Sequence, residues 1–311
     1  MNGPDKAGKP TVYVLEPIHE EAVEGLRAKV NLVTWEEKEV SRWHEGADAI
    51  IVRSHPVSAA DISLASRLQV VGKHGAGTDT IDVEAAARQG VAVISTPGVN
   101  APSVADLALA MALSLSRNLV GHTEALRHGV PLTGRQRVGY ELAELPAGII
   151  GLGAIGKAVA SRLRCGFGAT VKAYDPGIAD ADWPEDIGRA DSLHEILAAS
   201  RLLFLHVGLN DATRGMISAA ELAMLPEGAF LINCARGGVV NESDLANALA
   251  NGHLGGAASD VFEQEPPSPD LPLLHHPGFI ATPHIGGSTH EGLRRTGLEV
   301  VSKVLAQLGV E

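Results

Sequence analysis

Short apolar runs alternate with helix-sized segments over nearly the whole chain of 311 residues. The runs TVYVLEPI (11–18), ADAIIVRS (47–54), LQVVGKHGAG (68–77) and VAVISTPGV (91–99) have the length and the Val and Ile content of buried strands. Strands that alternate with helices in this way are typical of a parallel sheet. The pattern therefore predicts an α/β fold.

A long, mostly apolar segment, NAPSVADLALAMALSLSRNL (100–119), interrupts this alternation. Strand-like runs then resume at AGIIGLG (147–153) and continue to GFIATPH (278–284). This second set has about the size of a complete nucleotide-binding domain. We therefore expect a second α/β domain over residues 101–284.

The C-terminal segment STHEGLRRTGLEVVSKVLAQLGV (288–310) has apolar residues at a helical period. A single helix does not complete a sheet, so we expect it to pack on the first domain. The prediction is two Rossmann-like domains with parallel sheets, separated by a cleft. One is a discontinuous substrate-binding domain (1–100 and 285–311), and the other is a cofactor-binding domain (101–284).

The hexapeptide GLGAIG (151–156) has the GxGxxG spacing of a dinucleotide-binding loop. Glycine is common in this chain, so the flanking sequence has to decide between such a loop and an incidental turn. A strand-like AGII precedes it, and the helix-like GKAVASRLRCGFG (156–168) follows it. The run TVKAYDP then ends near Asp175, 19 residues after Gly156. This context predicts a bound dinucleotide.

Each position of the loop has an expected role. Gly151 permits the sharp turn, Gly153 lets the backbone approach the pyrophosphate, and Gly156 allows close packing of helix on strand. Ala154 and Ile155 open the helix whose N-terminus faces the phosphates. The carboxylate of Asp175 is expected to bind the adenosine ribose hydroxyls, which favours NAD over NADP.

Charge and composition exclude several classes of partner. The chain has 25 basic and 37 acidic residues, a formal net charge of −12, which argues against binding to nucleic acid or to an anionic membrane. No apolar run approaches the roughly 20 residues of a membrane span. An anionic substrate must therefore be attracted locally, by basic residues at its own site. We expect no metal site.

The cysteines and the N-terminus indicate a reducing compartment. The chain has two cysteines, Cys165 and Cys234, which we expect to be reduced core thiols rather than a disulfide. The N-terminal MNGPDKAGKP lacks the apolar core and the cleavage site of a signal peptide. We therefore expect a cytoplasmic protein.

Three further motifs, NCARGG, DVFEQEPP and TPHIGG, stand near the ends of later predicted strands. Together with GLGAIG and AYDP they closely resemble the D-isomer-specific 2-hydroxyacid dehydrogenase family, which includes D-3-phosphoglycerate dehydrogenases. The segments VGKHGAGTDTIDV and TPGVNAPSVADLAL resemble that family's substrate loop and interdomain helix, so the resemblance covers nearly the whole chain. It implies an NAD-dependent oxidoreductase that interconverts a D-2-hydroxy acid and a 2-oxo acid.

The resemblance also implies the catalytic residues. Arg236, in ARGG, binds the carboxylate and carbonyl of the substrate, a task that suits the planar guanidinium fork. His284, in PHIGG, exchanges a proton with the substrate oxygen. Glu265, in EQEP, is expected as a buried carboxylate that fixes the tautomer of His284 and favours its protonated form. Asp260, in ASDVF, is expected near the nicotinamide carboxamide.

In the first domain, the resemblance places substrate contacts on two loops. Arg53 matches a basic residue that contacts the substrate phosphate in phosphoglycerate dehydrogenases, and Lys73 and His74 are expected to add positive charge or to be solvated surface side chains. The backbone amides that would hold the substrate carboxylate are those of His74, Gly75, Ala76 and Gly77. Candidate substrates are 3-phosphoglycerate, glyoxylate and hydroxypyruvate.

The alternative function is an NAD-sensing corepressor, which shares the fold and the Arg-Glu-His set. A formate dehydrogenase is disfavoured, because that branch of the family has glutamine where this chain has Glu265. Some positions depart from the family, such as Gly208 where proline is common, so the resemblance implies the family rather than a particular subfamily. The resemblance also implies a homodimer formed around residues 100–119 and the arm to about 145, although that apolar helix is equally suited to burial within one chain.

Overall fold

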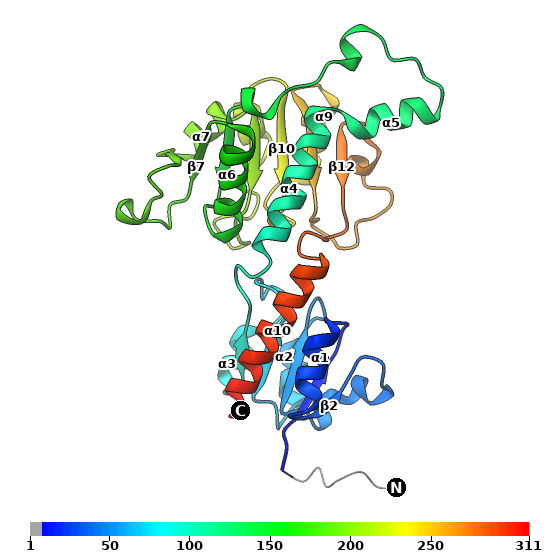
Figure 1. Cartoon of the computed structure of the whole chain (residues 1–311), viewed down its shortest axis with the longest axis vertical. Helices are drawn as coiled ribbons and strands as arrows, with labels where there is room; N and C mark the ends of the chain where they lie inside the picture. Colours follow the sequence, from blue (N-terminus) through cyan, green and yellow to red (C-terminus); the bar gives the residue numbers. More distant parts are fainter. Residues whose placement is uncertain (1–7, 311) are drawn as a thin grey trace. The chain divides into compact units, whose positions relative to one another are not determined.

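The computed structural model describes residues 8–310 and divides the chain into two compact units. The first unit runs to Asn100 and resumes at Gly287, rather than at residue 285, and the second is Ala101–Gly286. Each unit contains one sheet whose strands are all parallel (Figure 1). The expected α/β class with two Rossmann-like parallel sheets is confirmed.

The first unit has a five-stranded sheet in the order β2-β1-β3-β4-β5. Its strands are β1 (Thr11–Val14), β2 (Asn31–Val33), β3 (Ala49–Val52), β4 (Val70–Lys73) and β5 (Ala92–Ile94). Its helices are α1 (Glu20–Arg27), α2 (Ala59–Leu64), α3 (Val83–Arg88), α10 (His290–Gln307) and a 3-10 segment at Lys38–Glu45.

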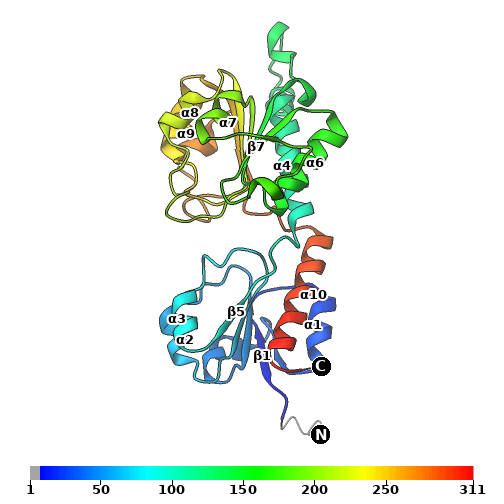
Figure 2. The ribbon, with the colours of Figure 1, turned by 90° about the vertical axis from the view of Figure 1, so that its left-hand side faces the viewer.

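The C-terminal helix α10 belongs to this first unit, as its apolar period predicts. It packs with α1 on one face of the sheet, while α2 and α3 cover the other face (Figure 2). Val300 and Val304 of α10 are fully buried against the sheet. At Gly72 of β4 an added Cβ would lie 2.6 Å from the Val304 side chain, so glycine is what lets the helix approach this strand.

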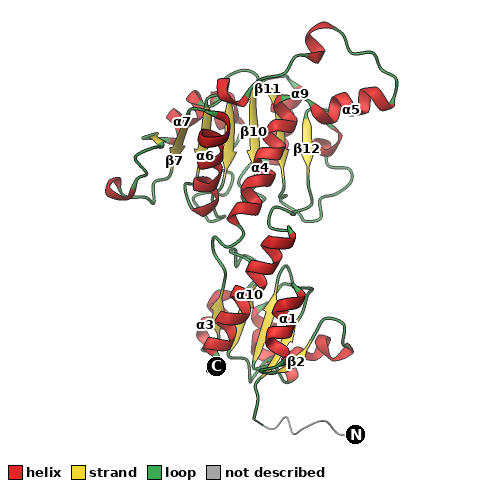
Figure 3. Ribbon diagram, in the orientation of Figure 1, coloured by secondary structure: helices red, strands yellow, loops and turns green. Residues whose placement is uncertain are grey.

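The second unit has a seven-stranded sheet in the order β12-β11-β10-β9-β6-β7-β8 (Figure 3). Its strands are β6 (Ala147–Ile150), β7 (Val171–Tyr174), β8 (Gly188–Arg189), β9 (Leu202–Leu205), β10 (Ala229–Asn233), β11 (Leu254–Ser259) and β12 (Phe279–Ala281). Its helices are α4 (Ala101–Ser116), α5 (Leu119–Arg127), α6 (Ala154–Phe167), α7 (Leu193–Ala199), α8 (Ala219–Met224) and α9 (Glu242–Ala250). Short 3-10 turns lie at Gly134–Arg137, Leu142–Glu144, Asp180–Asp182 and Pro272–His275.

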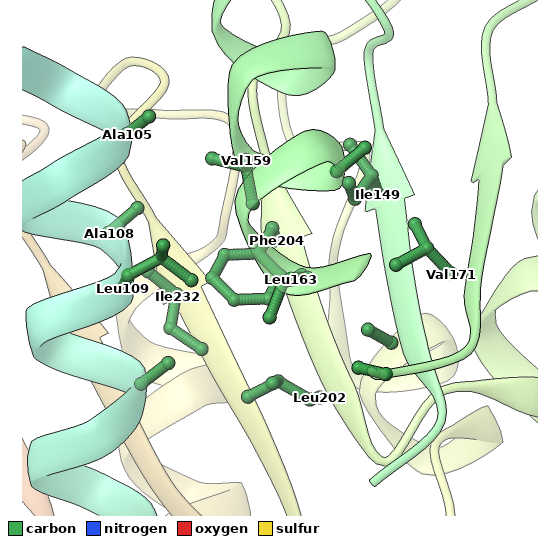
Figure 4. Packing of buried hydrophobic residues seen from close by; sticks show 14 of the residues in the cluster. Ala105, Ala108, Leu109, Ile149, Val159, Leu163, Val171, Leu202, Phe204 and Ile232 are labelled. Atoms are coloured by element: carbon green, nitrogen blue, oxygen red, sulfur yellow. The ribbon is translucent and has the colours of Figure 1, made fainter. Parts of the chain in front are cut away.

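Helices cover both faces of this sheet, so its central strands are buried throughout and read as continuous apolar runs. The helices α4 and α6 pack on one face around Phe204, and α7, α8 and α9 pack on the other. Figure 4 shows Phe204 between Leu109 of α4 and Leu163 of α6. This core fixes the strand ends that carry the candidate site.

The segment 100–119 forms two helices rather than one. α4 is largely buried within the second unit, which is one of the two outcomes its apolar faces allowed. Asn118 adopts a left-handed conformation, and α5 then begins at Leu119 with no buried residue among its described positions. In the described part of the chain no single helix is long and apolar enough to cross a membrane. The helices α4 and α5 have the length and composition of a span only when taken together, and the chain bends by 58° between them.

The two cysteines are unpaired. Cys234 is buried beside Met111, as expected of a core thiol, and burial together with the negative charge of Asp260 raises the pKa of Cys234 to about 12. Cys165, in contrast, is exposed. The expectation of two core thiols is therefore wrong for Cys165, because it lies on the outer side of α6.

Candidate active site

The carboxyl ends of the parallel strands in the second unit meet at one edge of the sheet. The strands β7 and β8 lie on one side of β6, while β9 to β12 lie on the other. The edge next to β6 and β9 is thus a topological switch point, where open α/β sheets bind their ligands. Each motif of the second unit follows one of these strands at this edge.

The glycine loop directly follows β6 and is folded tightly. Gly151 has a positive φ of 91°, and a Cβ added at Gly156 would lie only 2.1 Å from the carbonyl oxygen of Gly151. Any other residue at position 156 would push the helix away from the loop. The expected turn and the expected close packing are both present.

The start of α6 is suited to bind an anion. Its N-cap is Gly153, which has no side chain to cap the helix, and an added Cβ at this position would meet nothing within 4 Å. The first amides of the helix, including those of Ala154 and Ile155, therefore face a place that a ligand can approach closely. These residues fit the pyrophosphate of a dinucleotide and would hold it there.

Asp175 lies beside this loop at the end of β7. Its Oδ2 accepts a hydrogen bond from the Leu152 amide at 2.8 Å, and its Oδ1 accepts one from the Gly177 amide at 2.9 Å. Two fixed amides orient the carboxylate, and each of its oxygens retains further capacity to accept a hydrogen bond. This arrangement fits the expected contact with ribose hydroxyls.

His206, which the motifs did not single out, closes the other side of the loop. It follows β9, and an added Cβ at Gly151 would lie 2.5 Å from its carbonyl oxygen. Both of its ring nitrogens are buried, and neither has a hydrogen-bond partner among the described residues. Burial lowers the pKa of His206 to about 3, so the ring is neutral. An unsatisfied buried imidazole beside the glycine loop fits a site that a polar ligand completes.

Arg236 follows β10 on a loop that packs directly on the segment after β11. A Cβ added at Gly237 would lie 1.8 Å from the carbonyl oxygen of Phe262, so this close approach requires glycine. Arg236 is half-buried, and its Nη1 donates a hydrogen bond to the carbonyl oxygen of Ala235 at 2.7 Å. The close packing brings the guanidinium within electrostatic range of Glu265.

Glu265 and His284 form a hydrogen-bonded pair. Nδ1 of His284 lies 2.7 Å from Oε2 of Glu265, so Nδ1 carries the hydrogen and Nε2 is the nitrogen left for a substrate. The Glu265 side chain is 37% exposed and that of His284 is 49% exposed. The expectation of a buried carboxylate is therefore wrong, because the loop that carries Glu265 lies at the surface of the sheet edge.

The charge state of Glu265 suits its role as a partner of imidazolium. Partial burial opposes ionisation, but the hydrogen bonds from His284 and from the Phe262 amide, with the charges of His284 and Arg236, outweigh it. The pKa of Glu265 therefore lies below its usual value. The carboxylate is ionised at neutral pH and is protonated only at distinctly acidic pH.

Asp260 is buried, and its carboxylate is hydrogen-bonded within the chain itself. It is 2% exposed, and its carboxylate accepts hydrogen bonds from the Thr282 hydroxyl and from the amides of Ile285 and Gly286. The expected contact with the nicotinamide carboxamide stays a prediction. What the geometry establishes is that Asp260 binds the loop that carries His284.

In the first unit, Arg53 follows β3 and is held by the end of β1. Its amide donates to Oε2 of Glu16 at 2.6 Å, and its Nη1 donates to the carbonyl oxygen of Pro17 at 3.1 Å. The amides of Ser54 and His55 also donate to Glu16. Burial opposes ionisation of Glu16, but these amides and the charge of Arg53 outweigh it and keep its pKa below the usual value. The loop that carries Arg53 is therefore well fixed.

The expected basic cluster around Arg53 is only partly present. Lys73 is buried, and its Nζ donates to the carbonyl oxygen of Arg53 and to the hydroxyl of Thr80. His74 is also buried, with Nε2 at 3.3 Å from the carbonyl oxygen of Leu293. Burial and the charge of Arg53 lower the pKa of His74 to about 4. The expectation of positive charge on His74 is thus wrong, and neither side chain is a solvated surface group.

The glycines after β4 form a loop against the end of β5. The Gly75 amide donates to Oγ1 of Thr96 at 3.0 Å, so this amide is already used within the unit. The His74 amide is used too, since it donates to the carbonyl oxygen of Val52 at 2.8 Å, so a carboxylate bound by this loop would be held through Ala76 and Gly77. The role of this loop in binding the substrate carboxylate stays a prediction.

Comparisons with known proteins agree with the geometry. The profile of the D-isomer specific 2-hydroxyacid dehydrogenase NAD binding domain matches residues 109–286. The chain is 36% identical over 310 residues to a hydroxypyruvate reductase of Thermotoga maritima, covering 96% of this chain and 98% of that protein. It is also 36% identical over 304 residues to a D-3-phosphoglycerate dehydrogenase of Methanocaldococcus jannaschii, covering 94% of this chain and 56% of that longer protein.

A solved structure gives the same result. The D-lactate dehydrogenase of Aquifex aeolicus, complexed with NAD and lactic acid, superposes with a TM-score of 0.84 at 27% identity, covering 96% of this chain and 95% of that one. The chain belongs to the D-isomer-specific 2-hydroxyacid dehydrogenase family. The expected NAD cofactor and NAD-dependent dehydrogenase class are confirmed, and the corepressor alternative finds no support among these relatives.

Proposed function

We propose that this enzyme interconverts a small 2-oxo acid and its D-2-hydroxy acid, with Arg236, Glu265 and His284 as its catalytic residues. When bound, NAD(H) supplies or accepts the hydride at C2 of the acid. The observation that carries the proposal is the Glu265–His284 pair, at 2.7 Å, on the same strand-end edge as Arg236 and the glycine loop.

The three residues divide the remaining chemistry. Arg236 binds the carboxylate and the carbonyl of the 2-oxo acid and so orients C2. In reduction, protonated His284 gives the proton on Nε2 to the substrate oxygen, and in oxidation neutral Nε2 takes it back. Glu265 keeps the hydrogen of the other nitrogen in place and stabilises the imidazolium.

The substrate is proposed to be a 2-oxo acid such as glyoxylate, hydroxypyruvate or phosphohydroxypyruvate, and Arg53 is proposed to bind a second anionic group where one is present. Arg53 is a fixed cation in a chain with a net charge of −12, and this supports local attraction of an anion.

The test is NADH consumption with each of the three acids, for the parent and for Arg53→Ala. We expect turnover of at least one acid, and a higher KM for the phosphorylated acid in the variant. NADH binding without turnover of any 2-oxo acid would refute the proposed function. An unchanged KM for every active acid would refute only the role of Arg53.

The position of Asp175 leads to a prediction about cofactor choice. A 2′-phosphate would lie against a fixed carboxylate, and close like charges cost several kcal/mol, so we expect kcat/KM with NADH to exceed that with NADPH by about 100-fold or more. Asp175→Asn keeps an acceptor for the Leu152 amide while removing the charge. It should lower the ratio of kcat/KM with NADH to kcat/KM with NADPH. Equal efficiency of the parent with both cofactors would contradict the assignment.

We also propose a homodimer formed through α5 and the arm that follows it. Exposed apolar side chains gather there, and they include Leu119, Val120, Leu126, Val130 and Val138, with Leu126 80% exposed. Apolar groups concentrated on one segment support association. Light scattering should give twice the mass of one 32.3 kDa chain, and Leu126→Glu should lower the measured mass toward that of a single chain. A single-chain mass for the parent at working concentration would rule the dimer out.

The proposed location is the cytoplasm, with no nucleic-acid or membrane partner. The unpaired cysteines and the strongly negative charge support this proposal.

A further inference from the structure

His284 has an unusual backbone conformation for a residue with a side chain. Its φ is 53°, in the left-handed region, and the other non-glycine residue with a positive φ in the described part of the chain is Asn118. L-residues avoid this region because Cβ crowds the backbone, although Asn, Asp and His tolerate it better than most. Such a conformation persists at a site only where the surroundings hold it.

The residue that holds this turn is Asp260. Its carbonyl oxygen accepts a hydrogen bond from the amide of His284 itself, at 2.8 Å. Its carboxylate accepts the Ile285 amide on Oδ1 and the Gly286 amide on Oδ2, both at 2.8 Å. Three consecutive amides of the turn therefore donate to one residue.

Thr282 adds a fourth hydrogen bond from the other side of the turn. Its hydroxyl donates to Oδ1 of Asp260 at 2.6 Å. The pairing of β11 with β12 explains why the two side chains meet, since Ser259 lies opposite Ala281 and the next residues along are Asp260 and Thr282. The hydrogen bonds to the buried carboxylate within the described chain thus all come from the segment 282–286.

The consequence concerns the direction of the imidazole. The segment after β11 holds His284 twice, by its backbone through Asp260 and by Nδ1 through Glu265. Fixing both the Cα and one ring nitrogen leaves Nε2 in a defined direction. Proton transfer depends steeply on such alignment.

We propose that Asp260 and Thr282 are positioning residues that hold the left-handed turn at His284 and so aim Nε2 at the substrate oxygen. The inference rests on the proposed role of His284 in catalysis. It differs from a contact between Asp260 and the nicotinamide, because Thr282 can be altered without removing the Asp260 carboxylate.

The test compares Thr282→Val, which removes the hydroxyl donor, with Thr282→Ser, which retains it. Thr170→Val, at an exposed position of the same unit, is the matched control. We expect kcat for 2-oxo acid reduction to fall about tenfold or more in Thr282→Val, the effect of losing one hydrogen bond to a charged group. Thr282→Ser should restore kcat to within about twofold, and the Kd of NADH should change by less than about twofold in all three variants.

A second measurement is independent of activity. Hydrogen exchange of the peptide that contains residues 284–286 should be about tenfold faster in Thr282→Val than in the control. Parent-like exchange and parent-like kcat in Thr282→Val would overturn the inference. A weaker NADH affinity with parent-like kcat at saturating NADH would overturn it in favour of a cofactor contact. If the parent turns over no 2-oxo acid, the proposed function fails, and the exchange rates still decide whether Thr282 and Asp260 hold the turn at His284.

Discussion

Replacing His284 with asparagine should lower kcat for 2-oxo acid reduction by about 100- to 10,000-fold, the range over which a positioned general acid contributes. Asparagine is of similar size and keeps a polar group near Glu265, but it has no proton to transfer at neutral pH. The affinity of the variant for NADH should be close to that of the parent, because the glycine loop and Asp175 follow other strands, β6 and β7. Initial rates at saturating NADH, with the Kd of NADH measured separately, check both statements.

The exposed His194 on α7 provides the control. His194→Asn makes the same chemical change in the same unit, at an exposed position on the helix that follows the edge strand β8, and should leave kcat within about twofold of the parent, as is usual for surface substitutions. If His284→Asn kept more than about a tenth of the parental kcat, another group would be the proton donor.

Replacing Arg236 with glutamine should lower kcat/KM by about 100-fold or more, mainly through KM. Loss of one partner from a close charged contact costs about 2–5 kcal/mol, which corresponds to roughly 30- to several thousand-fold. Arg236→Lys should recover only part of this loss, because an ammonium keeps the charge but lacks the planar fork that matches a carboxylate. Steady-state kinetics with the most active 2-oxo acid give both numbers.

The two Arg236 variants together distinguish two roles of the side chain. A parental kcat/KM in Arg236→Lys would mean that charge alone matters and that bidentate binding of the substrate is not needed. A parental KM in Arg236→Gln would show that Arg236 does not bind the substrate.

Much of the fold follows from local sequence because the central strands are buried on both faces. Apolar runs such as LLFL in β9 and AGII in β6 have no solvent-facing positions and are recognisable without partners. The glycine loop is recognisable for a similar reason, since its spacing reflects local contacts between Gly151 and Gly156.

What the sequence did not reveal depends on contacts between distant segments. The charge of His74 is decided by burial beside Leu293, 219 residues further along the chain. The role of Thr282 depends on the register of β11 against β12, which no local pattern encodes. His206 ends an ordinary apolar strand, and its lack of partners emerges only once β9 lies beside β6. The family motifs located Glu265 but not its exposure, because loop depth is a tertiary property.

The pH dependence of kcat/KM for Glu265→Gln, measured in both reaction directions, tests the central claim most directly. The ionised carboxylate of Glu265 lies beside Nδ1 of His284 and favours imidazolium, and glutamine removes that charge while keeping the shape. Reduction requires imidazolium, so the alkaline limb of its pH profile should move toward acid in the variant. Oxidation requires neutral imidazole, so its acidic limb should move in the same direction and activity at low pH should be relatively spared. An equal loss of activity at every pH in both directions would contradict the proposed proton transfer, because Glu265 would then act through folding or positioning alone.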